Sequence, residues 1–234
     1  MKCIIPLAGP DIYTEKFGLK PSFEINGVPL LIKAIHSRDW YGKSLFEEDL
    51  IFIIRDFEFI DDLQKLINDN FPNGKQVVIP ELTCGALMSS IAGVSLIKDF
   101  NETIVIDLVD ILFESQFDPE KTFEINRSCV GLIPFFLSSN SQYSYLLINE
   151  KSNVIKAKEK RIISENASAG VYFYRNIGSF LNATIYSINN YNNISYNELL
   201  YLCPSFNGLV NDGRIVKAVE VKKVNPVSNY FKVV

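Results

Sequence analysis

The chain has 234 residues, of which 47% are apolar, so it is long enough to bury a sizeable core within one domain. Its net charge of −4 excludes a broad basic face for nucleic acid and leaves only local lysines to hold a small anion. The N-terminal apolar run is broken by Pro6 and Gly9, which is typical of neither a signal peptide nor a membrane-spanning helix.

Buried strands and helices alternate over the first half of the sequence. Continuous apolar runs predict strands at residues 4–7, 50–54, 76–79 and 104–108. The spacing of apolar side chains predicts helices at residues 29–38, 59–71 and 86–97. Continuous apolar strands separated by helices are typical of a parallel sheet that is covered on both faces.

After residue 110 the elements become shorter and richer in β-structure. The pattern predicts strands at residues 130–137, 144–148, 154–157 and 169–174, with a hairpin turn at 149–153. Helices at 180–188 and 198–211 and a strand at 215–221 follow, and the last 13 residues are expected to be a loop. Because no linker rich in Pro, Gly or Ser intervenes, we expect a single domain spanning residues 1–234.

Four cysteines are scattered along the chain without a CxxC motif or a Cys/His cluster, which predicts free thiols. Two of them, Cys3 and Cys129, lie in apolar strand-like runs and are expected to be buried. The other two are Cys84 and Cys203. Free thiols fit a reducing compartment, so we expect the protein to be cytoplasmic.

The first strand leads into the most informative stretch of the sequence. It ends at Ala8-Gly9, and a Lys20-Pro21 pair follows about ten residues later. A glycine at the end of a strand lets a ligand approach the main chain closely. A lysine at that distance can reach phosphates at the carboxyl edge of a parallel sheet, which is where such sheets bind ligands. The sequence therefore predicts a nucleotide site at this edge.

A series of short motifs extends this pattern over nearly the whole chain. In order, the motifs are Ala8-Gly9, Lys20-Pro21-Ser22, Asn26-Gly27-Val28-Pro29-Leu30, Thr83-Cys84-Gly85-Ala86-Leu87, the strand ending at Asp110, Glu159-Lys160, Ala169-Gly170-Val171-Tyr172-Phe173 and Phe206-Asn207-Gly208-Leu209-Val210. Their order resembles that in the sugar-phosphate nucleotidylyltransferases, the NDP-sugar pyrophosphorylases. The resemblance implies a Rossmann-like nucleotide-diphospho-sugar transferase fold of the α/β class, with a mixed, mostly parallel central sheet flanked by helices and an antiparallel extension in the second half.

The resemblance also implies an activity. A nucleotidyl group would pass from a nucleoside triphosphate to a sugar 1-phosphate or similar phosphorylated acceptor, with release of pyrophosphate, to make surface polysaccharide precursors. Residues 1–115 would form the nucleotide-binding half and residues 116–234 the acceptor-binding half. The expected partners are these two small molecules and, since the family often forms oligomers, a second copy of the chain; neither nucleic acid nor a membrane is expected.

Chemistry of this kind needs charge neutralisation and positioning more than covalent catalysis. By resemblance, Lys20 and Asp110 are the catalytic residues, and Asp110 also holds Mg²⁺, an ion that prefers one or two carboxylates together with phosphate oxygens and water. The residues expected to bind the nucleotide are Leu7, Ala8, Gly9, Lys16, Thr83 and Gly85. Those expected to bind the acceptor are Glu159, Lys160 and Gly170.

Each assignment has a structural alternative. Lys20 is otherwise a lysine in a surface loop, and Asp110 a turn residue that caps the next segment, with Asp107 as the second choice of metal ligand. Thr83 is otherwise a helix N-cap. Glu159 and Lys160 are otherwise part of a solvated, charged strand end.

The loop after Gly9 departs from the family pattern. Residues 10–17 lack the second glycine and the arginine that grip the triphosphate in the family. Pro10 removes an amide donor, and the carboxylates of Asp11 and Glu15 would repel phosphates. Residues 221–234 also contain no acid to serve as a second metal ligand.

Two hypotheses remain open after these departures. The protein is either a divergent enzyme or a catalytically impaired homologue that binds a nucleotide or sugar phosphate as a regulatory module. A glycosyltransferase fits less well, because that class tends to carry an Asp-x-Asp metal motif and the spacing from Asp107 to Asp110 differs.

Overall fold

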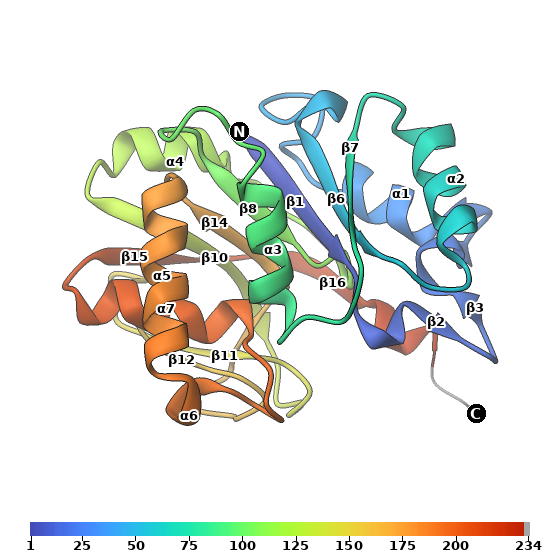
Figure 1. Cartoon of the computed structure of the whole chain (residues 1–234). Coiled ribbons are helices and arrows are strands. Elements are labelled where there is room, and N and C mark those ends of the chain that lie inside the picture. The colour runs from blue at the N-terminus through green and yellow to red at the C-terminus, as the bar shows by residue number, and fades with distance from the viewer. Residues whose placement is uncertain (232–234) are drawn as a thin grey trace.

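The computed structural model of the chain describes residues 1–231, in which ten strands form a central sheet with helices on both faces (Figure 1). The sheet contains β1 (Lys2–Leu7), β6 (Leu50–Arg55), β7 (Lys75–Ile79), β8 (Ile104–Asp107), β10 (Cys129–Leu137), β11 (Tyr145–Ile148), β12 (Val154–Lys158), β13 (Asn166–Ser168), β14 (Val171–Tyr174) and β15 (Ile215–Glu220). The helices are α1 (Leu30–His36), α2 (Ile60–Asn70), α3 (Ala86–Val94), α4 (Pro119–Ile125), α5 (Ile177–Asn189), α6 (Tyr191–Ile194) and α7 (Leu202–Asn211).

The strand order is β12-β11-β13-β10-β14-β8-β1-β6-β7, and β15 pairs with the other edge of β10. Strands β7, β6, β1 and β8 are parallel. Strand β14 joins β8 in antiparallel orientation, and the hairpin of β11 and β12 extends the antiparallel half. The expected α/β fold, with a mixed sheet that is parallel at its core and an antiparallel extension, is confirmed.

Side chains of the central strands alternate between two hydrophobic clusters, one on each face of the sheet. In β1, Cys3, Ile5 and Leu7 join the cluster under α1 and α2, whereas Ile4 joins the cluster under α3, α5 and α7. Figure 1 shows α3, α5 and α7 together on one side of the sheet. Burial on both faces explains why these strands are continuously apolar in sequence.

The described helices and cysteines agree with part of the sequence analysis. None of the helices in residues 1–231 combines the length and hydropathy that a membrane crossing needs. Cys3 and Cys129 are buried free thiols, as predicted, and Cys203 is a third. Cys84 is also free but exposed.

The helix predicted at residues 198–211 is wrong at its start, because α7 begins only at Leu202. The preceding backbone is engaged in tertiary hydrogen bonds. The Leu200 amide donates to the Cys84 carbonyl at 2.9 Å, and the Leu200 carbonyl accepts from the Leu87 amide at 3.3 Å. These bonds dock the segment against the start of α3, and Pro204 has no amide that could donate to the Leu200 carbonyl if the helix began earlier.

The loop predicted for the last 13 residues is also corrected. Strand β16 (Lys222–Pro226) pairs antiparallel with β9 (Ile111–Glu114), and a 3₁₀ turn, η4 (Val227–Asn229), follows. The end of this prediction, residues 232–234, lies outside the described residues. Strand β9 continues directly from the turn after β8, so its pairing places the C-terminal segment beside that turn.

The segment that carries Lys20 folds into two short ribbons. They pair β2 (Tyr13–Thr14) with β3 (Gly18–Leu19) and β4 (Glu24–Ile25) with β5 (Val28–Pro29), on either side of a 3₁₀ turn, η2 (Lys20–Ser22). The Phe231 ring lies 5.2 Å from Phe17 and 4.8 Å from Phe23, measured between centroids. Aromatic packing against the C-terminal segment therefore holds this segment in place.

Candidate active site

A cleft of about 570 Å³ lies at the carboxyl edge of the parallel strands. Because β1, β6 and β8 are parallel, the segments that leave them emerge at one edge of the sheet. The cleft lining includes all of the predicted site residues except Lys16: Leu7, Ala8, Gly9, Lys20, Thr83, Gly85, Asp110, Glu159, Lys160 and Gly170. Lys16 is exposed outside the lining, with its Nζ 5.1 Å from the centre of the Phe17 ring.

Lys20 lies in the cleft and is paired within the chain. Its Nζ donates a hydrogen bond to Asp11 Oδ2 at 2.8 Å, and Asp11 also lines the cleft. Although burial alone would raise it, the pKa of Asp11 is below its ordinary value because the Lys20 ammonium lies beside the carboxylate. The Lys20 ammonium is therefore paired with the Asp11 carboxylate, although it is also the group that a phosphate oxygen would contact.

Asp110 follows β8 and carries the feature that best marks a ligand site. Its Oδ1 is buried and has no hydrogen-bond partner. Burial raises the pKa of Asp110 from 3.8 to about 6, with Lys20 opposing and Asp107 adding to the shift. An unpartnered buried carboxylate oxygen is unfavourable unless a proton or a cation satisfies it.

The Asp110 carboxylate fits a magnesium ion that is shared with a substrate. Within residues 1–231, no group of three or more His, Cys, Asp or Glu side chains could hold a metal by itself. Magnesium needs only one or two protein carboxylates when phosphates and water complete its shell. Asp110 is the residue that would hold it here, where the ion would supply positive charge to the phosphates.

Gly170, between β13 and β14, makes room for Asp110. It has a φ of +75°, and a Cβ built on it would lie 2.6 Å from Asp110 Oδ1. Its carbonyl accepts a hydrogen bond from the Leu108 amide at 3.0 Å. Any larger residue would therefore displace the Asp110 carboxylate, and the conformation itself favours glycine.

A buried ion pair lies beneath the turn that presents Asp110. Arg38, just after α1, donates from Nε to Asp107 Oδ2 at 2.7 Å and from a terminal nitrogen to Oδ1 at 2.9 Å. A third hydrogen bond reaches the Ile111 carbonyl at 3.0 Å, and the guanidinium lies 4.1 Å from the Phe113 ring centre. Asp107 is thereby committed to a structural role and does not line the cleft.

The Arg38–Asp107 ion pair also stabilises an unfavourable backbone conformation at Val109. Val109 has a φ of +51°, in the left-handed region that β-branched residues rarely adopt. Its amide donates to Asp107 Oδ1 at 2.9 Å. On the far side of the turn, the Val227 amide donates to the Asp110 carbonyl at 2.9 Å. The turn therefore depends on Arg38 from one side and on the C-terminal segment from the other.

Glu159 and Lys160 follow β12 on the opposite wall of the cleft. The Ser144 hydroxyl donates a short hydrogen bond to Glu159 Oε2. Lys160 has its Nζ 5.3 Å from the Tyr196 ring centre and 5.6 Å from that of Tyr201. The cleft thus combines carboxylates, ammonium groups and aromatic rings, which suits a polar, charged ligand.

Gly85 shapes the wall formed by the start of α3. It has a φ of +101°, and a Cβ on it would lie 2.4 Å from the Leu200 carbonyl oxygen. The Thr83 hydroxyl donates to the Gly85 carbonyl at 3.1 Å, and the Gly85 amide to the Thr83 carbonyl at 2.8 Å. Only glycine permits this close approach between the turn and the segment before α7.

No family model matches the sequence, and no curated protein matches it. Solved structures of other proteins do match it. The nucleoside-diphosphate-sugar pyrophosphorylase from Vibrio cholerae RC9 aligns with a TM-score of 0.79 and 18% identity over 99% of this chain and 98% of that one. The chain therefore has a sugar-nucleotidyltransferase fold.

Two further structures have this nucleotidyltransferase fold. A UDP-glucose pyrophosphorylase complexed with UDP-glucose gives a TM-score of 0.63 and 16% identity, covering 94% of this chain and 91% of that one. The inositol-1-phosphate CTP transferase from T. maritima gives a TM-score of 0.62 and 16% identity, covering 96% of this chain and 86% of that one. At these identities the likeness shows the fold alone.

Several residues that line or support this nucleotidyltransferase-fold cleft have roles that the sequence does not reveal. Arg38 has no local signal, because its partner Asp107 is 69 positions away. Ser144 is likewise identified only by its contact with Glu159. Asp11 was expected to repel phosphates, but its pairing with Lys20 depends on the fold of the intervening ribbon.

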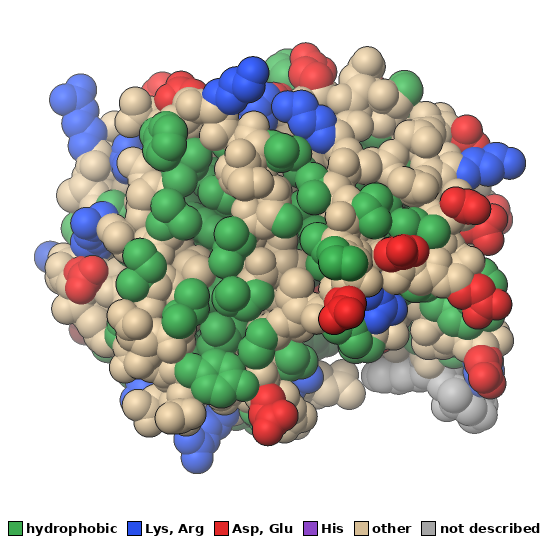
Figure 2. Space-filling model, viewed as in Figure 1, with side chains coloured by type: hydrophobic (Ala, Val, Ile, Leu, Met, Phe, Trp, Pro, Cys, Tyr) green, Lys and Arg blue, Asp and Glu red, His purple; other side chains and the backbone are tan. Residues whose placement is uncertain are grey.

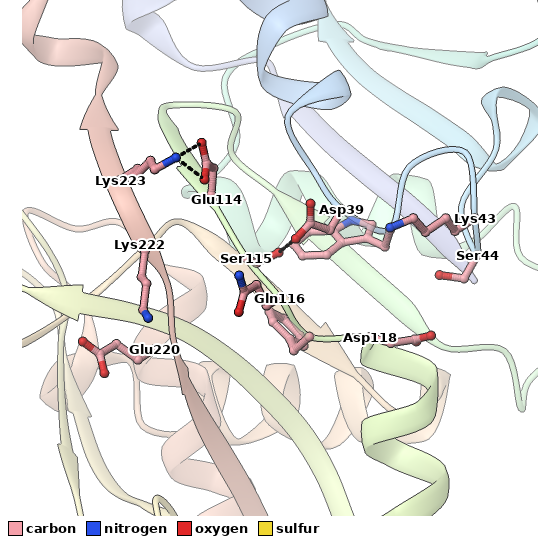
Figure 3. A pocket seen from close by; sticks show the side chains of 12 residues that line it. Asp39, Lys43, Ser44, Glu114, Ser115, Gln116, Asp118, Glu220, Lys222 and Lys223 are labelled. Atoms are coloured by element: carbon pink, nitrogen blue, oxygen red, sulfur yellow. Dashed lines mark hydrogen bonds and ion pairs between the residues drawn. The ribbon is translucent and has the colours of Figure 1, made fainter.

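A second cavity of about 730 Å³ is larger but less suited to this chemistry (Figure 3). It lies between the segment after α1, the segment after β9 and the start of β16, and contains none of the predicted site residues. Its charged groups are of both signs and partly paired, as in Lys223–Glu114 at 2.8 Å. None of the unpartnered buried side-chain atoms of residues 1–231 belongs to its lining.

The titration of Glu159 leads to a prediction about stability. Burial raises the pKa of Glu159 from 4.5 to about 7, and Asp110 adds to the shift, while Ser144 and Lys160 oppose it. A carboxyl that binds its proton more tightly in the folded state stabilises that state at low pH. We therefore expect the free energy of unfolding to fall as the pH rises from about 4.5 to about 7, and to fall less in Glu159→Gln.

Urea unfolding at a series of pH values measures this dependence. The matched control is Glu150→Gln, at an exposed turn, which should follow the wild type. Since Asp110 titrates in an overlapping range, Glu159→Gln should reduce the slope without abolishing it. A slope in Glu159→Gln equal to that of the wild type would contradict the prediction.

Proposed function

We propose that the protein transfers a nucleotidyl group from a nucleoside triphosphate to a sugar 1-phosphate or similar phosphorylated acceptor. A phosphate oxygen of the acceptor forms a bond to the α-phosphorus, the bond from that phosphorus to the bridging oxygen breaks, and pyrophosphate leaves with the electron pair. The observation that carries the proposal is the convergence of Lys20 and the unpartnered carboxylate of Asp110 in one cleft at the carboxyl edge of the sheet. The fold and the names of its structural neighbours support the same reaction class.

The roles of the residues follow from their charge and position. Lys20 and Asp110 both line the cleft, and the Lys20 ammonium opposes the rise in the pKa of Asp110. There the ammonium would neutralise charge that develops on the transferred phosphate. For this the Lys20–Asp11 ion pair must open, and the triphosphate then replaces the Asp11 carboxylate as the partner of Lys20.

One wall of the cleft would bind the nucleotide, and the other would bind the acceptor. Leu7, Ala8 and Gly9 would contact the nucleotide through main-chain groups, together with Thr83 and Gly85 at the start of α3. On the other wall, Glu159 would accept hydrogen bonds from acceptor hydroxyls, and Lys160 would contact the acceptor phosphate. Gly170 contributes by leaving space for Asp110.

The setting we propose for this activity is the reducing cytoplasm, which the free thiols support. The product would be an activated sugar or polyol of the kind used in surface polysaccharides. The substrates are small molecules, in keeping with a cleft of about 570 Å³.

A panel of nucleotides tests the proposal. Thermal unfolding is measured with ATP, CTP, GTP, UTP and dTTP, each with and without magnesium, and we expect one of them to stabilise the protein in a magnesium-dependent manner. Release of pyrophosphate is then measured with that nucleotide and glucose 1-phosphate or inositol 1-phosphate. Stabilisation without pyrophosphate release from any phosphorylated acceptor would favour the impaired binding module. No stabilisation by any nucleotide would refute the transferase, and no stabilisation by glucose 1-phosphate or inositol 1-phosphate either would refute the binding module as well.

A further inference from the structure

Residues 227–231, which we call the C-terminal strap, contact three separate parts of the candidate active site. The strap consists of η4 and the two aromatic residues that follow it, Tyr230 and Phe231. Figure 1 shows this end of the chain beside β2 and β3. The three contacts are with the turn that carries Asp110, with the acceptor wall and with the segment that carries Lys20.

The first contact supports the turn that carries Asp110. The Val227 amide donates to the Asp110 carbonyl at 2.9 Å, and the Val227 side chain is buried in the cluster on the α1 and α2 side of the sheet. Just before the strap, Pro226 of β16 pairs with Ile111 of β9, the residue that follows Asp110. The position of Asp110 in the cleft therefore depends on the position of the strap.

The second contact is with the acceptor wall. Tyr143 lines the cleft next to Ser144, whose hydroxyl donates to Glu159. Burial raises the pKa of Tyr143, and a hydrogen bond with the Ser228 side chain opposes the rise. A tyrosine offers a ligand both an apolar ring and a polar hydroxyl. The strap therefore holds a side chain that the acceptor would contact.

The third contact is with the segment that carries Lys20. The Phe231 ring packs against both Phe17 and Phe23, which lie on either side of Lys20 in the sequence. The Tyr230 ring adds a further contact, 6.5 Å from Phe23 between centroids. The Phe23 amide donates to the Lys20 carbonyl at 3.2 Å, so a displacement of Phe23 also displaces the turn at Lys20.

The segment that carries Lys20 needs such support from outside. Its two ribbons, β2 with β3 and β4 with β5, have only two residues in each strand. An isolated two-stranded ribbon is marginally stable at best, so contacts with other parts of the chain must fix its position. The aromatic rings of the strap supply contacts of this kind.

We propose that the C-terminal strap positions Lys20, Asp110 and Tyr143 relative to one another. None of residues 227–231 lines the cleft, so the strap acts through the residues that it holds, and Phe231 is a positioning residue for Lys20. The catalytic consequence rests on the proposed function, in which Lys20 and Asp110 must reach the same phosphates. A displacement of about 1 Å between such groups is sufficient to slow a reaction substantially.

Hydrogen–deuterium exchange of the full chain, followed by NMR, tests whether the strap holds the segment that carries Lys20. In Phe231→Ala the Phe23 amide should exchange about 10-fold faster than in the wild type, because two aromatic contacts are lost. Phe231→Tyr keeps the ring and should restore the exchange rate of the wild type.

The kinetics of pyrophosphate release separate two effects of the strap. Phe231→Ala should lower kcat about 10-fold and change the acceptor KM less than about 2-fold, because Lys20 acts on the transferred phosphate. Ser228→Ala should raise the acceptor KM about 5-fold and leave kcat unchanged, because Tyr143 would contact the acceptor away from the reacting atoms. A general loss of stability would not divide between kcat and KM in this way.

The matched control is Tyr186→Ala, which, like Phe231→Ala, removes a partly buried aromatic side chain. Tyr186 belongs to α5, which Figure 1 places on the opposite side of the view from the strap, and the surface over α5 is mainly hydrophobic in Figure 2. This variant should match the wild type both in exchange at Phe23 and in pyrophosphate release.

Unchanged exchange at Phe23 in Phe231→Ala overturns the proposal. A kcat of Phe231→Ala equal to that of Tyr186→Ala overturns it too. If the wild type releases no pyrophosphate from any substrate, the proposed function fails, and exchange at Phe23 then decides by itself whether the strap holds the segment that carries Lys20.

Discussion

Replacing Lys20 with alanine is expected to lower the rate of pyrophosphate release by about 10²–10³-fold. The ammonium lies in the cleft, and its charge acts on Asp110. Its loss would leave Lys160 as the remaining ammonium group among the residues that line the cleft. Steady-state kinetics with the nucleotide selected by thermal shift measures the effect.

Two neighbouring residues provide controls, one expected to leave the activity unchanged and one expected to strengthen triphosphate binding. Lys16→Ala removes a lysine of the same loop that lies outside the cleft, so its activity should match that of the wild type. Asp11→Asn removes the carboxylate paired with Lys20, so the triphosphate should bind more tightly. If Lys20→Ala were as active as Lys16→Ala, Lys20 would have no catalytic role, and the proposed mechanism would be wrong.

Replacing Arg38 with leucine is expected to lower the free energy of unfolding by about 3–5 kcal/mol. The Arg38 and Asp107 side chains are only 2% and 4% exposed, so the substitution leaves an uncompensated carboxylate in the core. The hydrogen bond to Ile111 and the contact with Phe113 are lost as well. Urea unfolding measures the change.

A second substitution separates the buried charge from other losses. Asp107→Asn in the Arg38→Leu background removes the charge but keeps an acceptor for the Val109 amide, so the double variant should be more stable than Arg38→Leu. Lys223→Leu breaks the exposed pair with Glu114 and should change stability by no more than about 0.5 kcal/mol. A double variant less stable than Arg38→Leu would show that the charge itself is not the cause.

The loss of Arg38 should also be felt in the cleft. The strained Val109 conformation depends on the Asp107 carboxylate that Arg38 orients, and Asp110 is the next residue. Any Arg38→Leu protein that remains folded should therefore release pyrophosphate more slowly than the wild type. Its unfolding and its activity thus report on the same turn.

The local pattern of the sequence was sufficient to predict the central strands of the sheet. Strands such as β1 and β8 are buried on both faces, so their side chains must be apolar at every position, and that requirement is visible in a single sequence. Parallel strands share a carboxyl edge, so Gly9 and Asp110 could be expected at one site before any coordinates were known. The motif order added the fold, which the structural neighbours bear out.

Tertiary contacts decided the rest. The start of α7 and the pairing of β16 with β9 depend on backbone hydrogen bonds between segments far apart in sequence. The same is true of Arg38 with Asp107 and of Ser144 with Glu159, since a side chain carries no local mark of a distant partner. Periodicity and motif order are short-range properties that survive in the sequence, whereas ion pairs and raised pKa values arise only when the folded chain brings distant residues together.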